Sequence, residues 1–335
     1  MSPQMFRSLT AMGLATCLTV GVTHQGYATV MSRRCPTGFE RHRVRCTSGN
    51  ILTYYLRRGA VGGPTVVCEA GFMSTSTSWL LVADHLDPDI SVLVYDRAGY
   101  RGSLRRCPEE YCLAESVADL VEVIADGVGG GFCVLAGHSL GGYIAHRAAS
   151  AAPDRVHGLV LVDPTHPREL RNSLKQRAGA TTTNMAMKLG PWSVTFGGGL
   201  LIDKQSLYAF ADGSPHAAAL RLELSAAATW RAGRREWGYT YAFLLDAGRP
   251  LDRLEVPVLV VAAAETLEQT PEQMDLHQKY VVSGTDGSCV TVEGSSHLSV
   301  LCSVEHAPST AQMIEKAVAA ITAANVVTTC EELVR

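Results

Sequence analysis

The fold is decided by the stretch Val134-Leu135-Ala136-Gly137-His138-Ser139-Leu140-Gly141-Gly142. Its Gly-x-Ser-x-Gly pattern follows an apolar run and precedes residues 143–149, whose composition predicts a helix. A serine on such a strand-to-helix turn sits at a strained backbone position with an exposed hydroxyl, and flanking glycines avoid collisions with neighbouring elements. The positive end of the helix then faces any negative charge that develops beside the hydroxyl. The pattern predicts that Ser139 is a nucleophile.

Length and composition are those of a globular chain. The 335 residues suffice for one large α/β domain or two small ones. Apolar residues make up 47% and charged residues 18%, which fits a packed core and excludes a disordered chain. The net charge of −3 gives no reason to expect a nucleic-acid partner. Neither a phosphate-binding Gly-rich loop nor zinc-like Cys/His spacing occurs, so no cofactor and no metal are expected.

The N-terminus has the pattern of a secretory leader. Leu9–Val22 is an uncharged, mostly apolar run behind Arg7, and Gly26-Tyr27-Ala28 has the small-x-small form of a cleavage site. The run is shorter than the about 20 residues that a membrane-spanning helix needs, so no stable span is expected. We expect residues 1–28 to be a signal peptide and the protein to be secreted. A cytoplasmic protein with a weakly apolar leader is the alternative.

The ten cysteines agree with export, because this density is unusual for a chain kept in reducing cytosol. Cys107 and Cys112 bracket a loop small enough for a disulfide to close, and Cys35 and Cys46 bracket another short segment. Spacing predicts that disulfides are present but does not determine their connectivity.

Short apolar runs alternate with helical stretches along most of the chain. Further strands are predicted at Glu40–Cys46, Ile51–Arg57, Thr65–Glu69, Ile90–Tyr95, Val156–Val162, Val256–Ala263 and Cys289–Val292. The rhythm stops between Pro164 and about Arg253, where helical stretches such as Ala217–Arg231 are broken by Pro191 and by Gly197-Gly198-Gly199. We therefore predict a mostly parallel sheet formed by residues 36–163 and 254–325, and a helical cap of residues 164–253 over the carboxyl ends of the strands.

A serine hydroxyl is nearly inert at neutral pH and needs a base within hydrogen-bonding distance. Among the 11 histidines, His297 lies in a Gly/Ser loop directly after the last predicted strand and before a helix that starts near Val304. A loop at the carboxyl end of a strand can bring an imidazole over Ser139. The chain order serine, acid, histidine is also that expected around this serine motif, so His297 is the predicted base.

The imidazole needs a carboxylate that orients it, and two positions qualify. Asp163 ends the strand that follows the nucleophile helix, and Pro164 breaks that strand directly after it. Glu265 follows the strand Val258–Val261, the more usual position of the acid, and no aspartate occurs between Val256 and Met274. We favour Asp163 and keep Glu265 as the alternative.

Two backbone amides are expected to form an oxyanion hole. The Leu140 amide follows the serine directly. The second donor should follow the third strand, where Glu69-Ala70-Gly71-Phe72 places the Phe72 amide and Gly71 permits the required backbone conformation.

These pieces together resemble the α/β-hydrolase superfamily, and within it the lid-bearing, single-domain serine hydrolases. The resemblance spans about residues 40 to 325. It rests on five segments in order, which are Glu69-Ala70-Gly71, Tyr95-Asp96-Arg97-Ala98-Gly99-Tyr100, Gly137-His138-Ser139-Leu140-Gly141-Gly142, Leu161-Val162-Asp163-Pro164-Thr165-His166-Pro167 and Gly294-Ser295-Ser296-His297. The resemblance implies an eight-stranded, mostly parallel sheet with helices on both faces, a helical cap, and hydrolysis through an acyl-enzyme.

The chain departs from the family pattern at three places. The usual His-Gly after the third strand is Ala70-Gly71 here, and the usual Gly-Arg-Ser after Tyr100 is Arg101-Gly102-Ser103. The glycine and acid expected after Val261 are replaced by Ala262-Ala263-Ala264-Glu265. The first two changes leave the backbone donors intact, and the third concerns only the acid.

We therefore expect a cofactor-free serine hydrolase that cleaves an ester or thioester of a small to medium, largely apolar acyl group. A small-molecule substrate is the expected partner. Serine at the nucleophile position argues against an epoxide or haloalkane hydrolase, for which the family uses aspartate. A carbon–carbon hydrolase or a haloperoxidase on the same triad, and a non-catalytic ligand binder with the same fold, are the alternatives.

Overall fold

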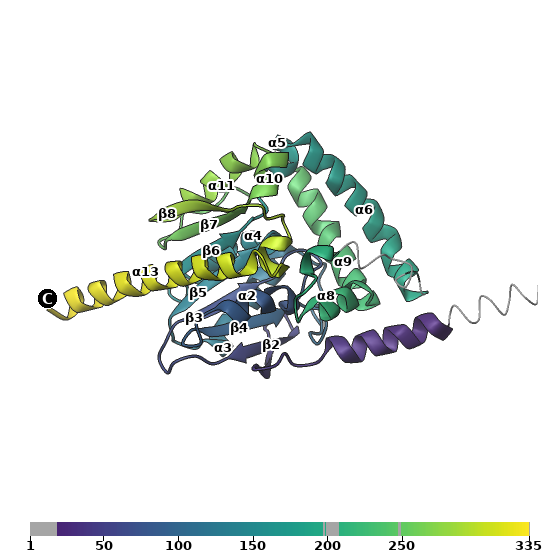
Figure 1. Cartoon of the computed structure of the whole chain (residues 1–335), viewed down its shortest axis with the longest axis horizontal. Coiled ribbons are helices and arrows are strands. Elements are labelled where there is room, and N and C mark those ends of the chain that lie inside the picture. The colour runs from purple at the N-terminus through teal and green to yellow at the C-terminus, as the bar shows by residue number, and fades with distance from the viewer. Residues whose placement is uncertain (1–18, 197, 199–207, 247–248, 335) are drawn as a thin grey trace, which may run out of the picture.

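The computed structural model describes residues 19–196, 198, 208–246 and 249–334, with side chains described up to residue 324. Among these residues, eight strands form one sheet through the centre of the molecule (Figure 1). The strands are β1 (Glu40–Arg45), β2 (Ile51–Arg57), β3 (Thr65–Glu69), β4 (Ser91–Asp96), β5 (Cys133–His138), β6 (Gly158–Val162), β7 (Val258–Ala263) and β8 (Gly287–Val292).

The order across the sheet is β1-β2-β4-β3-β5-β6-β7-β8. β1 and β2 form an antiparallel hairpin, and β2 also pairs antiparallel with β4. All remaining pairs are parallel. The predicted eight-stranded, mostly parallel sheet is confirmed.

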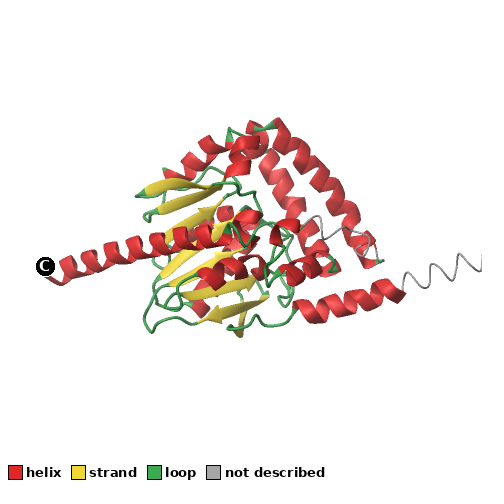
Figure 2. Cartoon of the chain, in the orientation of Figure 1, coloured by secondary structure: helices red, strands yellow, loops and turns green. Residues whose placement is uncertain are grey.

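Helices cover both faces of this sheet (Figure 2). One face carries α2 (Leu80–His85) and α13 (Ala307–Val334), and the other carries α3 (Leu113–Gly127), α4 (Leu140–Ala151) and α11 (Gln273–Val281). Successive strand residues serve opposite layers, so Val66 packs in the first layer and Val67 in the second. Because both faces are buried, the central strands are continuous apolar runs without polar alternation.

Between β6 and β7 the chain leaves the sheet and forms a group of helices. They are α5 (Glu169–Asn172), α6 (Leu174–Thr195), η3 (Ala209–Ala211), α8 (Ala217–Leu224) and α9 (Ala227–Leu245). We call residues 164–253 the cap. α6 and α9 pack along each other beside one end of the sheet (Figure 1). Phe72 of the core packs against their shared apolar cluster, which consists of Leu170, Ala180, Met187, Trp237 and Leu244.

Two expectations for the cap were wrong. The single helix predicted over Ala217–Arg231 is two helices, because the chain turns at Ser225 and Ala226 between α8 and α9. Pro191 does not break a helix either, since it lies inside α6. The loss of its N–H removes one helical hydrogen bond. α6 continues to Thr195 beyond that position and packs against α9.

Residues 19–32 form a helix that contacts the cap. The Gln25 side-chain amide donates to the carbonyl oxygens of Val194 and Ser225, at 3.2 and 2.9 Å. The Ala227 amide donates to Gln25 Oε1 at 2.7 Å. Residues 1–18 of the predicted signal peptide lie outside the described residues. No helix within the described ranges is both long and apolar enough to cross a membrane.

The expected disulfide between Cys107 and Cys112 does not form in the structure. Both are free thiols, as are Cys35, Cys46 and the other cysteines whose side chains are described.

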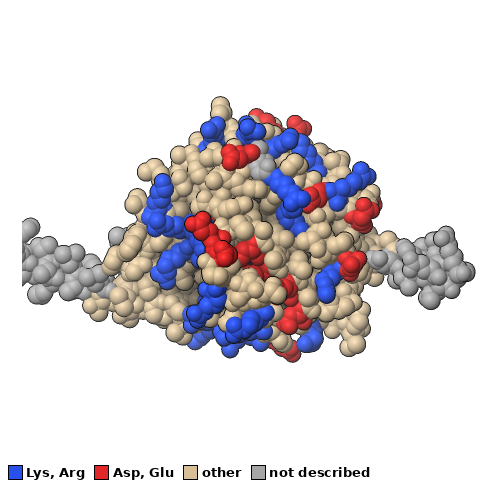
Figure 3. Space-filling model, turned by 180° about the vertical axis from the view of Figure 1, so that it is seen from behind, with Lys and Arg blue, Asp and Glu red and all other residues tan. Residues whose placement is uncertain are grey.

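On the face seen from behind, acidic and basic side chains both lie among a larger area of other residues (Figure 3).

Candidate active site

Ser139 lies between the end of β5 and the first turn of α4. Its backbone has φ 54° and ψ −125°, a conformation that L-residues rarely adopt. A Cβ added at Gly137 would lie 2.6 Å from the Gly141 carbonyl oxygen, and one added at Gly141 would lie 2.4 Å from the Ala70 carbonyl oxygen. Glycine at both positions therefore allows β5, α4 and the loop after β3 to approach closely around the serine.

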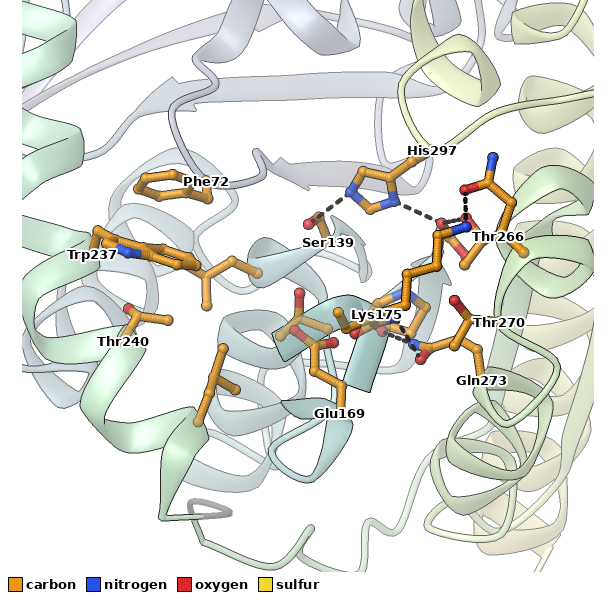
Figure 4. Close-up of a pocket in the computed structure, with 17 residues that line it drawn as sticks. Phe72, Ser139, Glu169, Lys175, Trp237, Thr240, Thr266, Thr270, Gln273 and His297 are labelled. Carbon is orange, nitrogen blue, oxygen red and sulfur yellow. Dashed lines mark hydrogen bonds and ion pairs between the residues drawn. The ribbon is translucent and has the colours of Figure 1, made fainter. Parts of the chain in front are cut away.

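Three side chains from different elements form a hydrogen-bonded row in the structure. His297 Nε2 lies 3.0 Å from Ser139 Oγ (Figure 4). His297 Nδ1 lies 2.6 Å from Asp163 Oδ2. His297 comes from the loop after β8, and Asp163 follows the last residue of β6. In this arrangement the carboxylate holds Nδ1–H, which leaves Nε2 free to accept the serine proton.

Asp163 is 2% exposed and has a positive φ of 43°. Thr266 Oγ1 donates to its Oδ2 at 2.6 Å, the Ala263 amide donates to Oδ1 at 3.4 Å, and His277 Nε2 lies 3.6 Å from Oδ1. Burial alone would raise the pKa of Asp163, but His297, His277 and Thr266 together hold it below its usual value. The carboxylate is therefore ionised at neutral pH.

Glu265 is not brought to His297. Its exposed side chain hydrogen-bonds the Gln269 amide, while its backbone N–H donates to the Ser295 carbonyl at 2.9 Å. The next residue along α10 (Ala264–Gln269) is Thr266, which supports Asp163. Sequence reasoning missed Thr266 and His277. The position of Thr266 just after β7 was the available signal for it, and no comparable signal indicated His277.

The His297 side chain is 44% exposed, and its ring packs against a second imidazole. Burial lowers the pKa of His297, but the hydrogen bond and charge of Asp163 outweigh it and raise the pKa above 6.5. The His138 ring packs on His297 with centroids 4.7 Å apart, and its Nε2–H donates to the His297 carbonyl oxygen at 2.7 Å. Burial lowers the pKa of His138 to about 3, so this ring stays neutral and holds the loop.

The two predicted amides lie beside Ser139. Leu140 is the first residue of α4, and Phe72 follows Gly71, at which a Cβ would lie 3.2 Å from Ser139 Cβ. Within the described parts of the chain, neither the Leu140 nor the Phe72 N–H donates to a backbone acceptor. Both residues line a pocket with Ser139, and we expect their N–H groups to face it.

This pocket has a volume of about 380 Å³ and two unlike walls. Phe72 and Trp237 stand on one side of Ser139, and Lys175, Thr270 and Gln273 on the other (Figure 4). Leu140 and Leu244 extend the apolar lining, while Glu169, Gln176 and Gln269 extend the polar lining. Burial raises the pKa of Glu169 to about 7, so it is partly protonated at neutral pH.

No group of three or more His, Cys, Asp or Glu side chains within the described ranges could hold a metal ion.

Comparison with known proteins gives matches of two kinds. The lipase LipV of Mycobacterium tuberculosis is 33% identical over 115 residues, which are 34% of this chain and 42% of LipV. RutD of Enterobacter cloacae, a proposed carbamate hydrolase, is 32% identical over 102 residues, which are 30% of this chain and 38% of RutD. The aligned stretch thus spans less than half the length of either relative. A crystal structure of a proposed alpha/beta hydrolase from Nostoc superposes with a TM-score of 0.68 at 21% identity, covering 84% of this chain and 98% of that chain.

The widest match is to a family rather than to one protein. The model of the alpha/beta hydrolase family matches residues 66–310, which contain β3 except its first residue, β4 to β8, Ser139, Asp163, the whole cap and His297. The chain therefore belongs to the alpha/beta hydrolase family.

Proposed function

We propose that the protein is a cofactor-free serine hydrolase that cleaves an ester or thioester of a small to medium, largely apolar acyl group. The observation that carries the proposal is the row in which His297 links Ser139 Oγ, at 3.0 Å, to Asp163 Oδ2, at 2.6 Å. A serine activated in this way by a neutral imidazole is an effective nucleophile for acyl transfer.

The proposed reaction has two halves. Ser139 Oγ attacks the carbonyl carbon while His297 Nε2 takes its proton, and the amides of Phe72 and Leu140 hold the resulting oxyanion. His297 then gives this proton to the leaving alcohol or thiol, which leaves an acyl-enzyme on Ser139. In the second half, water donates its proton to His297 and attacks the acyl carbon, and the proton returns to Ser139 as the acid departs.

The two walls of the pocket support the choice of substrate class. Phe72 and Trp237, whose ring centroids are 4.9 Å apart, offer an apolar surface for an acyl chain. Glu169, Gln273 and Thr270 offer hydrogen-bonding groups suited to a polar leaving group. The partner proposed for this site is accordingly a small molecule with one apolar and one polar end.

Export is a further part of the proposal. It is supported by the apolar run Leu9–Val22, the small residues around Ala28 and the high cysteine content.

A fluorophosphonate probe tests the proposed nucleophile, because it reacts covalently with activated serines. We expect one label per chain, on Ser139, and its loss in Ser139→Ala together with a fall in ester turnover of about 10⁶-fold. Ser150→Ala is the matched control. Ser150 lies on α4, the helix that follows Ser139, but its hydroxyl hydrogen-bonds Asp252 at 2.7 Å, outside the pocket. Unchanged hydrolysis by a folded Ser139→Ala protein would refute the serine mechanism. A panel of acyl esters of increasing chain length then measures the acyl preference.

A further inference from the structure

Arg97 lies in the loop after β4 and is 4% exposed, between the core and the cap. Its Nη1 lies 2.6 Å from Glu69 Oε1, at the end of β3. On the other side, Nε and Nη2 lie 2.7 and 3.0 Å from the two carboxylate oxygens of Glu236 on α9 of the cap. Tyr100 also donates to Glu236, at 2.8 Å. The guanidinium is thus held from both sides by buried carboxylates.

The same guanidinium reaches the backbone of the loop after β3. Nη1 donates to the Ala70 carbonyl oxygen at 2.5 Å, and Nη2 donates to the Gly71 carbonyl oxygen at 2.8 Å. The Gly71 carbonyl and the Phe72 N–H belong to one peptide unit, and that N–H is one of the two amides beside Ser139. A bond to the oxygen of a planar peptide determines where its N–H points.

Charge strengthens this contact. Burial alone would lower the pKa of Arg97, but Glu236 and Glu69 raise it well above the usual value, so the side chain is cationic. A cationic donor on the carbonyl polarises the peptide and makes its N–H a stronger donor in turn. The Ser74 N–H also donates to the Gly71 carbonyl oxygen, at 3.2 Å, so Arg97 supplies the shorter and charged one of the two contacts that orient this peptide.

We propose that Arg97 is a positioning residue that orients the Phe72 amide toward the oxyanion, and that Glu236 makes this orientation depend on the docked cap. The inference rests on the proposed function, because it concerns the oxyanion hole of that reaction. Arg97 does not line the substrate pocket, so it acts through the backbone rather than on the substrate.

A second buried contact between cap and core provides an internal control. Glu223 on α8 is 6% exposed and accepts hydrogen bonds from the Thr75 and Thr77 hydroxyls, both at 2.5 Å. Arg101 Nε lies 3.6 Å from Glu223 Oε1. This contact joins the cap to the core as Glu236 does, but it does not reach the backbone of residues 69–72.

The experiment compares Glu236→Gln, Arg97→Gln and Glu223→Gln in the full chain. It measures kcat and KM for one ester, the inhibition constant of a boronic acid that forms a tetrahedral serine adduct, and the melting temperature. For Arg97→Gln we expect kcat to fall about 10²-fold and boronate binding to weaken in parallel, with KM within about twofold. Glu236→Gln should lower kcat about tenfold and weaken boronate binding in parallel, because it removes the charge on one of the two carboxylates that hold the Arg97 guanidinium. Glu223→Gln should leave kcat within about twofold, even if its melting temperature falls as much as that of Glu236→Gln.

Equal kcat values for Glu236→Gln and Glu223→Gln would overturn the inference, because both would then report cap attachment alone. The inference would also be overturned if Arg97→Gln and Glu236→Gln changed KM and left kcat unchanged. If Arg97→Gln fails to fold, the comparison of the two glutamate variants still decides. A folded wild-type protein without hydrolysis or probe labelling refutes the proposed function, and this inference with it, whereas an active wild type with the wrong variant pattern refutes this inference alone.

Discussion

Ser139 and Asp163 both have a positive φ, of 54° and 43°. Such conformations cost about 1–3 kcal/mol each in a non-glycine residue and persist only where the surroundings hold them. Asp163 N–H donates to the Val261 carbonyl at 2.8 Å, and Ser139 N–H donates to the Val162 carbonyl at 3.1 Å, so neighbouring strands hold both turns. At each position the turn directs the side chain out of the sheet and toward His297.

The first prediction concerns the carboxylate. Asp163→Asn should fold, since asparagine also tolerates a positive φ, but turnover should fall about 10³- to 10⁴-fold because the amide favours the wrong imidazole tautomer. Glu265→Gln is the control and should cost about tenfold or less, since Glu265 makes no bond to His297. Steady-state kinetics on both variants measures this. If Glu265→Gln loses more turnover than Asp163→Asn, the acid has been assigned wrongly.

The second prediction is the pH dependence of kcat/KM. His297 must be neutral to accept the Ser139 proton, and Asp163 raises the pKa of His297 above 6.5. Activity should therefore be low in acid and rise with pH through a midpoint above 6.5. In Asp163→Asn the raising contact is lost, so the residual activity should have a midpoint at lower pH. A wild-type midpoint well below 6.5 would contradict the assigned role of His297.

At the scale of elements, the site depends on how closely α4 approaches the loop after β3. A Cβ at Gly141 would lie 2.4 Å from the Ala70 carbonyl oxygen and 2.5 Å from that of Glu69. These are backbone atoms, so no flexible side chain could move aside. The distance between α4 and this loop sets the separation of the Leu140 and Phe72 amides.

The third prediction follows from this contact. Gly141→Ala should destabilise the protein by about 1–3 kcal/mol through overpacking. It should also lower turnover about 10²-fold, because it displaces the amides. Gly179→Ala on α6 is the matched control, since nothing lies within 4 Å of its added Cβ, and it should be neutral or stabilise by about 1 kcal/mol. Thermal denaturation and kinetics measure both effects. Equal behaviour of the two variants would show that the close approach has no role.

For the whole molecule, the cap is joined to the core through polar contacts as well as apolar ones. Glu236 meets Arg97 and Glu223 meets the Thr75 and Thr77 hydroxyls, each in a buried environment. Removing one partner from such a contact leaves an uncompensated buried charge and is strongly destabilising. The cap is therefore expected to be held on the core through both α8 and α9.

The fourth prediction concerns the N-terminus and compartment. If residues 1–28 are a cleaved leader, the mature chain lacks Gln25 and its contacts with Val194, Ser225 and Ala227. Intact mass of native material should show loss of the leader. A native chain that retains Met1 would contradict export.

The sequence alone was enough to predict the strands and the turn at Ser139, because both depend on local pattern. Apolar runs with intervening helices specify buried parallel strands, and glycines around a serine specify a tight strand-to-helix turn. The two helices within Ala217–Arg231 were missed because no glycine or proline marks the break at Ser225 and Ala226. The two helices contact different parts of the core, α8 at Ser76–Trp79 and α9 at α3.

Only the tertiary structure decided which carboxylate meets His297. Asp163 and Glu265 follow neighbouring parallel strands and end at the same edge of the sheet, so chain order could not separate them. The left-handed turn at Asp163 directs its carboxylate to His297, whereas α10 begins at Ala264 and carries the Glu265 side chain outward to solvent. The contact of Arg97 with Glu236 likewise joins residues 139 positions apart, and no periodicity in a sequence encodes such a distance. It exists because the cap folds back over the loop after β3.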